Sequence, residues 1–283
     1  MSTVAAPTIV SHEIDIRSHD DDGTPREMGF FTDTSLCIGC KACEVACKEW
    51  NLVPDDGLEW TGDSYDNTTS LGCNSWRHVA FIEQSKPVSV PDVQAGGVRW
   101  LMASDVCKHC SNAACLEVCP TGALTRTEFG TVVVQPDVCN RCGYCVPACP
   151  FGVLDKREDD GRAWKCTLCY DRLKDDMEPA CAKACPTKSI QFGELKQLRM
   201  IADDRVRQLQ ARGEEHASLY LAGDDNGVGG AHAFFLLLDR PEVYGLPPDP
   251  VDSTRDLRTI WTSAAVAAAG AAVAVALASL RGR

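Results

Sequence analysis

Apolar residues recur at helical spacing after the last cysteine of the chain. They fall on one face of a single helix, at positions Leu195, Leu198, Ile201, Ala202, Val206 and Leu209. This period predicts an amphipathic helix over residues 194–212. Gly213 follows it and suits a helix end.

Shorter apolar stretches predict strands. Residues 78–82 and 98–102 are strand-like pieces within a polar stretch rich in Gly and Asp, and residues 231–238 form an apolar run typical of a buried strand. Two segments without such a pattern are expected to be irregular. Residues 223–230 predict a flexible Gly-rich stretch, and residues 241–250 predict an extended Pro-rich connector.

The longest apolar segment, residues 260–280, contains no charged residue. About 20 apolar residues are needed to cross a bilayer, so we expect a single transmembrane helix with Trp261 at the interface. Because the segment is rich in Ala, a soluble Ala-rich helix or a disordered tail is the alternative. Arginines are balanced on the two sides, at positions 255 and 258 and at 281 and 283, so charge predicts no orientation.

Composition adds an unusual cysteine content. The chain has 283 residues and 17 cysteines, which indicates either a disulfide framework or metal binding. Disulfide frameworks belong to short secreted chains, usually under about 100 residues. This chain is longer and its cysteines form tight runs of four, so metal binding is favoured.

The net charge of −12 and the pI of about 4.9 argue against a nucleic-acid binder, which needs the opposite sign. Iron–sulfur clusters held by thiolates would add further negative charge. Basic residues beside the cysteines offer a local offset, with a solvated surface position as the alternative for each. They are Lys41, Lys48, Lys108, Arg141 and Lys165.

Sixteen cysteines form four related runs. Cys37-x2-Cys40-x2-Cys43-x3-Cys47 and Cys139-x2-Cys142-x2-Cys145-x3-Cys149 carry the bacterial ferredoxin spacing. Cys107-x2-Cys110-x4-Cys115-x3-Cys119 and Cys166-x2-Cys169-x11-Cys181-x3-Cys185 are the same pattern with insertions. Three of the runs are followed directly by Pro. The repeat predicts iron–sulfur clusters.

The spacing has a physical reason. Three closely spaced cysteines wrap one loop around a cluster, and the fourth points away to a neighbouring cluster. We expect this fourth cysteine at the start of a helix, with the following Pro at the first helical position. The residues alone leave open which runs are partners.

Zinc is the alternative metal, but zinc ribbons use paired C-x2-C motifs with long separations. Cys73 stands outside the runs and is interpreted as an apolar or surface thiol. His109, inside a ligand loop, could hydrogen-bond a cluster sulfur, although an ordinary loop histidine is the simpler interpretation.

The four runs resemble the ferredoxin-like subunits of molybdenum and tungsten oxidoreductases. The chain is most similar to the beta subunit of membrane-bound respiratory formate dehydrogenase, from about residue 31 to residue 250. The segments that carry the resemblance include 33–43, 49–51, 165–172, 178–181, 227–232 and 244–247. In the related nitrate reductase subunit a Trp replaces one ligand, whereas this chain has Cys142 there.

The resemblance implies four [4Fe–4S] clusters with crossed ligands. Cluster A takes Cys37, Cys40, Cys43 and Cys185, and cluster B takes Cys47, Cys166, Cys169 and Cys181. Cluster C takes Cys107, Cys110, Cys115 and Cys149, and cluster D takes Cys119, Cys139, Cys142 and Cys145. The same sixteen cysteines therefore bind the iron, and we find no catalytic residue in the chain.

The expected fold is α+β, with two pseudo-symmetric ferredoxin-like dicluster modules, extensions and a C-terminal transmembrane helix. An N-terminal arm covers residues 1–32 and the four-cluster region residues 33–195. Within this region, residues 33–60 and 155–195 form one module, residues 100–154 the other, and residues 61–99 an insertion. Residues 196–255 are expected to be a partner-binding extension, and residues 256–283 a membrane anchor.

The resemblance implies an electron-transfer subunit without catalysis of its own. Electrons would come from a molybdopterin subunit, with Mo or W, that oxidises formate, and would pass to a membrane cytochrome b or quinone-reactive subunit. The alternatives are the same role with a sulfur-compound or sulfoxide reductase or a hydrogenase, and, more remotely, a zinc scaffold.

The expected location is the inner membrane, with a single span through residues 260–280. The first 31 residues lack a continuous apolar stretch and a twin-arginine pair. We therefore expect the cluster region to be exported with its partner and to lie on the periplasmic side.

Overall fold

A computed structural model describes residues 14–57, 60–63, 65–84 and 98–281. The first part of the predicted arm, residues 1–13, lies outside the described residues. So do positions 64 and 85–97 of the predicted insertion and the last two residues of the predicted anchor.

The central sheet joins the two ends of the body. Within the described residues it has four strands, in the order β8 (Ile190–Glu194), β1 (Met28–Asp33), β10 (Ala233–Leu237) and β9 (Ser218–Tyr220). Strand β1 pairs in parallel with β10 and antiparallel with β8. All six residues of β1 and all five of β10 are buried, as expected for strands covered on both faces.

Helix α6 (Leu195–Gln210) follows β8 and packs against the sheet through Leu195, Leu198, Ala202 and Leu209. It confirms the predicted helix. Strand β10 confirms the predicted buried strand. β10 therefore brings part of the predicted extension 196–255 into the core.

The remaining strands pair as hairpins. Strand β2 (Arg77–Gln84) pairs antiparallel with β3 (Arg99–Val106), which confirms the two strand-like pieces. Strand β4 (Leu124–Arg126) pairs with β5 (Val132–Val134), and β6 (Asp155–Lys156) with β7 (Ala163–Trp164). With the helices below, these elements confirm the α+β class.

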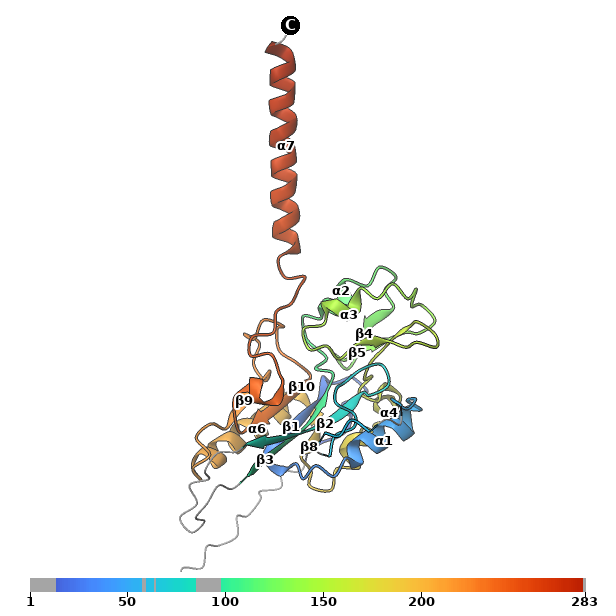
Figure 1. Ribbon diagram of the computed structural model, residues 1–283, viewed down its shortest axis with the longest axis vertical. Coiled ribbons are helices and arrows are strands. Elements are labelled where there is room, and N and C mark those ends of the chain that lie inside the picture. The colour runs from blue at the N-terminus through green and yellow to red at the C-terminus, as the bar shows by residue number, and fades with distance from the viewer. Residues whose placement is uncertain (1–13, 58–59, 64, 85–97, 282–283) are drawn as a thin grey trace, which may run out of the picture.

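Short helices lie beside the cysteines. They are the 3₁₀ helix η1 (Thr34–Leu36) and the α-helices α1 (Ala42–Asn51), α2 (Ala114–Glu117), α3 (Cys145–Ala148), α4 (Tyr170–Lys174) and α5 (Ala180–Lys183). Figure 1 shows α2, α3, β4 and β5 together at the upper end of the body, and α1 and α4 on one side below them.

The expected place of the fourth cysteine was wrong. Cys119, Cys149 and Cys185 follow the ends of α2, α3 and α5, and the prolines after them begin turns. Proline has no N–H and cannot continue the hydrogen bonding of the helix that precedes it. The C-P pair therefore marks a helix end and not a helix start.

Two segments predicted to be irregular are more ordered than expected. The segment 223–230 is held against the second cysteine run, since Val228 and Gly230 accept hydrogen bonds from the Asn112 and Ser111 N–H groups at 2.8 and 3.0 Å. The predicted extended connector contains a 3₁₀ helix, η2 (Pro241–Tyr244).

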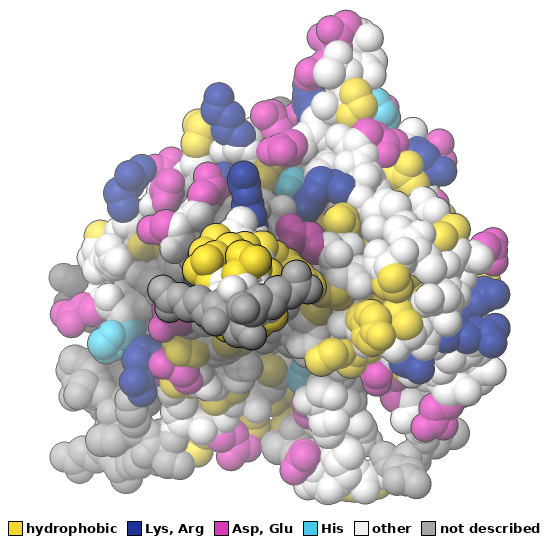
Figure 2. Space-filling view, turned by 90° about the horizontal axis from the view of Figure 1, so that it is seen from above, with side chains coloured by type: hydrophobic (Ala, Val, Ile, Leu, Met, Phe, Trp, Pro, Cys, Tyr) yellow, Lys and Arg dark blue, Asp and Glu magenta, His cyan; other side chains and the backbone are white. Residues whose placement is uncertain are grey.

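Helix α7 (Leu257–Arg281) projects from the body (Figure 1). Residues Leu257–Leu280 have a mean hydropathy of 2.0, and none of the most apolar window is buried within the chain. By length and composition this helix can cross a membrane. Figure 2 looks down on the molecule from the α7 end and shows the apolar side chains of the helix gathered at the centre of the view.

The base of α7 is attached to the module that contains α2. The Thr254 hydroxyl donates to Glu117 of α2, and both Thr254 and Asp252 are buried. The segment leading to the helix is therefore fixed to the upper end of the body.

Candidate electron-transfer centres

The four ligand loops share one backbone feature. In each run, the residue just before the second cysteine has a positive φ: Gly39 (65°), His109 (46°), Arg141 (68°) and Leu168 (56°). A left-handed residue turns the chain back on itself, so that successive N–H groups can face one centre. At Gly39 a side chain would also be excluded by space, because a Cβ there would lie 2.6 Å from the Phe81 ring.

All seventeen cysteines are free thiols. Among the residues that the structure describes, no three His, Cys, Asp or Glu side chains are arranged to hold one metal ion. Sulfurs that are gathered without disulfides and without a single-ion geometry suit a larger polynuclear group.

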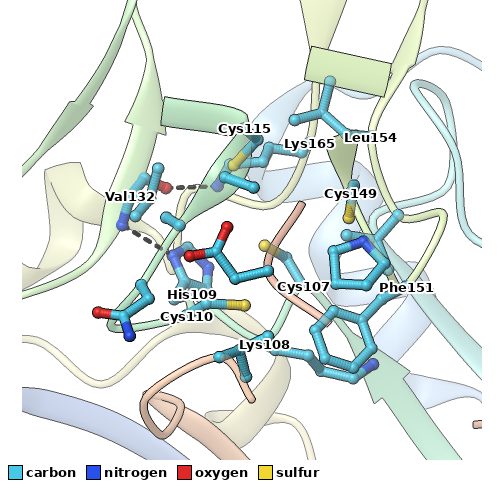
Figure 3. A pocket seen from close by; sticks show the side chains of 17 residues that line it. Cys107, Lys108, His109, Cys110, Cys115, Val132, Cys149, Phe151, Leu154 and Lys165 are labelled. Carbon is cyan, nitrogen blue, oxygen red and sulfur yellow. Dashed lines mark hydrogen bonds between the residues drawn. The ribbon is translucent and has the colours of Figure 1, made fainter. Parts of the chain in front are cut away.

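Two groups of cysteines line cavities. Cys107, Cys110 and Cys115 of the second run share a cavity with Cys149 of the third run (Figure 3). Cys37, Cys40 and Cys43 share another with Cys185 of the fourth run. In both cases the fourth sulfur comes from a different run than the first three.

The other two groups are recognised by the mutual influence of their thiols. Burial raises the pKa of Cys47, and repulsion from Cys166, Cys181 and Cys169 raises it further. Asn51 connects two members of this group, because its Nδ2 lies 3.7 Å from the Cys47 sulfur and 3.8 Å from the Cys169 sulfur.

Cys145 marks the remaining group. Burial raises the pKa of its thiol to about 11, and Cys119, Cys142 and Cys139 contribute by repulsion. The structure thus brings together every foursome expected from the sequence. Cys73 lies outside all four groups, half-buried, with its carbonyl accepting from Trp76 Nε1 at 2.8 Å.

The thiols need cationic compensation to ionise. Burial raises the pKa values of Cys43, Cys115, Cys166 and Cys169 to about 12. Four buried sulfurs in one group cannot all become thiolates unless positive charge enters with them. Iron ions supply that charge, and a coordinating thiol is deprotonated outright. The donor set therefore fits an iron–sulfur cluster.

Contacts between groups define a sequence of neighbours. Cys181 of one group influences Cys43 of the next, Cys107 influences Cys166, and Cys145 influences Cys115. The groups therefore follow one another in a row. Cys40 at one end and Cys142 at the other are exposed, whereas the four cysteines of the group containing Cys47 are buried.

Two of the basic residues singled out in the sequence are buried. Lys108 pairs with Asp105, and its Nζ donates to the Val106 carbonyl at 2.8 Å. Lys165 donates to the Val132 carbonyl and, at 2.9 Å, to the Cys166 carbonyl. Lys41 and Lys48 are partly exposed in ion pairs with Asp66 and Asp56, and Arg141 is exposed.

His109 is buried, with 1% of its surface exposed, and lines the cavity of the Cys107 group (Figure 3). Its Nδ1 accepts from the Val132 N–H at 3.0 Å. The proton of the neutral ring is therefore on Nε2, which has no partner in the described part of the chain. Burial, with help from Lys165, lowers the pKa of the ring and favours this neutral form.

Sequence reasoning missed Arg77. It lies at the start of β2, outside every cysteine run, yet it is buried and donates to the Cys181 sulfur at 3.2 Å. No motif marks it, because its role depends on the β2–β3 hairpin lying over two cysteine groups. An arginine within a strand of the predicted insertion was the single available signal.

Comparisons with known proteins agree with this chemistry. Two family models, each described as a 4Fe-4S dicluster domain, match residues 36–123 and 98–195. The nitrate-inducible formate dehydrogenase iron–sulfur subunit of Escherichia coli is 42% identical over 251 residues, which cover 86% of this chain and 80% of that one. The formate dehydrogenase iron–sulfur subunit of Haemophilus influenzae is 40% identical, over 88% of this chain and 78% of its own.

A more distant similarity is to the iron–sulfur subunit of the E. coli anaerobic dimethyl sulfoxide reductase, 35% identical over 61% of this chain and 76% of that subunit. These relatives are iron–sulfur subunits and not catalytic subunits. The chain carries [4Fe–4S] clusters and is an electron-transfer subunit of a molybdoenzyme complex. It belongs to the family of formate dehydrogenase iron–sulfur subunits.

Proposed function

We propose that this chain conducts electrons from a molybdopterin subunit that oxidises formate, through four [4Fe–4S] clusters, to a cytochrome b or quinone-reactive subunit in the membrane. The observation that carries the proposal is the gathering of sixteen cysteines into four neighbouring groups of four. The similarity to formate dehydrogenase subunits along most of the chain supports formate as the electron source.

The proposed ligands are the foursomes of the sequence analysis. Clusters A and B share the first and fourth runs, and clusters C and D share the second and third. The shared cavities of Cys37 with Cys185 and of Cys107 with Cys149 support this crossed pattern. Each cluster, when bound, accepts and releases one electron.

The chain's own residues keep the clusters in place and apart from water. The left-handed loop residues aim backbone N–H groups toward the sulfurs, while buried thiols at the two inner groups exclude solvent. Buried cations such as Lys165 favour the more negative, reduced state of a nearby cluster. No proton transfer by a side chain is required.

The contacts between neighbouring groups support the order A–B–C–D. We place cluster D toward the membrane, because α2 of the same module binds the base of α7 through Glu117 and Thr254. Figure 1 shows α2 and α3 at the end of the body from which α7 rises. The bilayer contact is through residues 260–280.

The cluster A end suits a catalytic partner. Cys40 is exposed there beside a groove lined by Ile38, Tyr65, Phe81, Trp100 and Met102. Ile38 is 59% and Tyr65 75% exposed. An apolar, aromatic rim around an exposed ligand is typical of a surface that a second protein covers.

The deciding experiment uses the native complex, purified anaerobically from membranes through a tag on this chain. Formate is added, and the electron paramagnetic resonance spectrum is recorded alongside iron, zinc and sulfide analysis. We expect reduced four-iron signals within the turnover time of the enzyme.

Other outcomes discriminate the alternatives. Clusters that respond to dithionite but not to formate would exclude formate as donor and favour another partner. A sulfoxide reductase is the second candidate, because the iron–sulfur subunit of such an enzyme is among the relatives. Zinc without acid-labile sulfide would exclude electron transfer altogether.

A further inference from the structure

Arg77 lies between two of the cysteine groups and contacts both, directly or through one side chain. Its Nη2 donates to the Cys181 sulfur at 3.2 Å. Its Nη1 donates to the Ser104 hydroxyl at 3.3 Å, and that hydroxyl hydrogen-bonds with the Cys43 sulfur at 3.2 Å. Cys181 belongs to the proposed cluster B and Cys43 to the proposed cluster A.

The guanidinium is held rigidly in this position. It lies over the ring of Phe30, with 4.9 Å between its Cζ and the ring centroid, and Nη1 also donates to the Ser104 carbonyl at 3.3 Å. Phe30 is fully buried in the central sheet, and Ser104 lies in β3, next to the strand that carries Arg77. The hairpin and the sheet therefore fix the fork from two sides.

Arg77 is buried, with 2% of its surface exposed, and within the described residues it has no carboxylate partner. By contrast, buried Lys108 pairs with Asp105, and Arg205 pairs with Asp33. A buried cation without an anion is strongly unfavourable. The anions near Arg77 are the sulfurs of Cys181, Cys43, Cys166 and Cys47, which belong to both groups.

One donor of the guanidinium is still free. Nε is buried and has no hydrogen-bond partner in the described part of the chain. Buried N–H groups without partners are rare, and each costs about 1–3 kcal/mol. An acceptor brought in with a cluster, such as an inorganic sulfide, would remove that cost.

We propose that Arg77, assisted by Ser104, is an electrostatic bridge between the first two clusters that raises their reduction potentials. The inference rests on the proposed function, because it assumes clusters in both groups. Reduction adds one negative charge to a cluster, and a cation bonded to a ligand sulfur stabilises that form. Placed between two sites, the same cation also offsets their mutual repulsion when both are reduced.

Arg77 is a positioning residue, so the test is a potential and not turnover. The full complex is prepared with Arg77→Gln, Arg77→Lys and Ser104→Ala, and each cluster potential is measured by redox titration with paramagnetic resonance detection. Arg99→Gln is the matched control, since Arg99 lies on the same hairpin at its opposite end and pairs with the surface residue Glu214.

With Arg77→Gln we expect the reduction constant of cluster B to fall about tenfold, which is 59 mV for a one-electron couple. Cluster A should shift in the same direction by less. Arg77→Lys keeps the charge but not the fork, so its shift should be smaller. Ser104→Ala should lower the potential of cluster A and leave cluster B nearly unchanged.

The result that would overturn the proposal is full iron and sulfide content in Arg77→Gln with potentials no different from those of Arg99→Gln. If Arg77→Gln fails to assemble, Ser104→Ala decides: an unshifted cluster A excludes the bridge. Either failure leaves the proposed function intact, because that function is judged on the wild-type complex, by formate-driven reduction and sulfide content.

Discussion

At the scale of single residues, position in the chain and position in space are separated by the crossed arrangement of the cysteines. Cys115 and Cys119 are only four residues apart, yet they belong to different groups, while Cys149 joins Cys115 from another run. The left-handed residue before each second cysteine makes this possible, because it closes the loop early and lets the helix that follows carry the fourth sulfur away.

This separation predicts a specific pattern of losses on Cys→Ser substitution. Cys115→Ser and Cys149→Ser should remove or convert the same paramagnetic signal, that of cluster C. Cys119→Ser should affect another signal, that of cluster D, although it is the nearer neighbour of Cys115 in sequence. Iron content and spectra of the three variants provide the measurement.

Cys73→Ser is the control and should leave the spectra and the iron content unchanged. If Cys115→Ser and Cys119→Ser instead removed one common signal, each run would hold its own cluster, and the crossed assignment would have to be abandoned.

At the scale of elements, helices with a clear period were predictable and helices next to cysteines were not. The apolar positions of α6 and the uncharged length of α7 are local signals, and both helices form close to the expected bounds. The short helices α2, α3 and α5 have only four residues each, too few for any period to be visible. The Pro after their final cysteine was therefore assigned to the wrong end of a helix.

The same reasoning explains what the sequence could tell about the site. Ligand residues were identifiable because the C-x2-C spacing is imposed by the cluster itself. Arg77 and the orphaned Nε2 of His109 were not, since their surroundings come from β3 and from Val132, distant in sequence or unmarked by any motif. Tertiary contacts of this kind leave no local pattern.

Helix α7 carries a prediction of its own. Arginine at the centre of a membrane helix costs about 2.5–3.5 kcal/mol of insertion free energy. Ala269→Arg, at the middle of the helix, should therefore move a large part of the chain from the membrane to the soluble fraction. Thr259→Arg, near the helix end, should have little effect because the side chain reaches the interface. Carbonate extraction followed by blotting measures both.

If Ala269→Arg stayed as firmly in the membrane fraction as the wild type, attachment would depend on protein partners and not on the helix. Repeating the extraction in cells that lack the partner subunits separates the two contributions.

At the scale of the whole molecule, the body has two distinct ends. One end presents Cys40 in an aromatic groove, and the other presents Cys142 and the base of the membrane helix. A row of redox groups with both ends accessible is suited to joining two partners that never touch each other. The position of α7 assigns the membrane partner to the Cys142 end.

Sidedness is a property of the whole molecule as well. We expect the body to lie outside the inner membrane, so protease added to intact spheroplasts should degrade it while a cytoplasmic marker survives. Protection of the body until the spheroplasts are lysed would instead put it in the cytoplasm.

The place of β1 in the central sheet has a consequence for biosynthesis. This strand is made early, but its partners β8 and β10 begin only at residues 190 and 233. At translation rates of about 5–20 residues per second, a buried apolar strand waits roughly 10–40 s for its last neighbour. The segment before β10 also closes over the second cysteine run, where Ala231 bridges to Cys110. Until that moment the cysteines stay open to the iron-delivery machinery and the strand edges stay open to aggregation. Completion of the sheet therefore ends the period in which the nascent chain can be loaded and begins the period in which it no longer needs a chaperone.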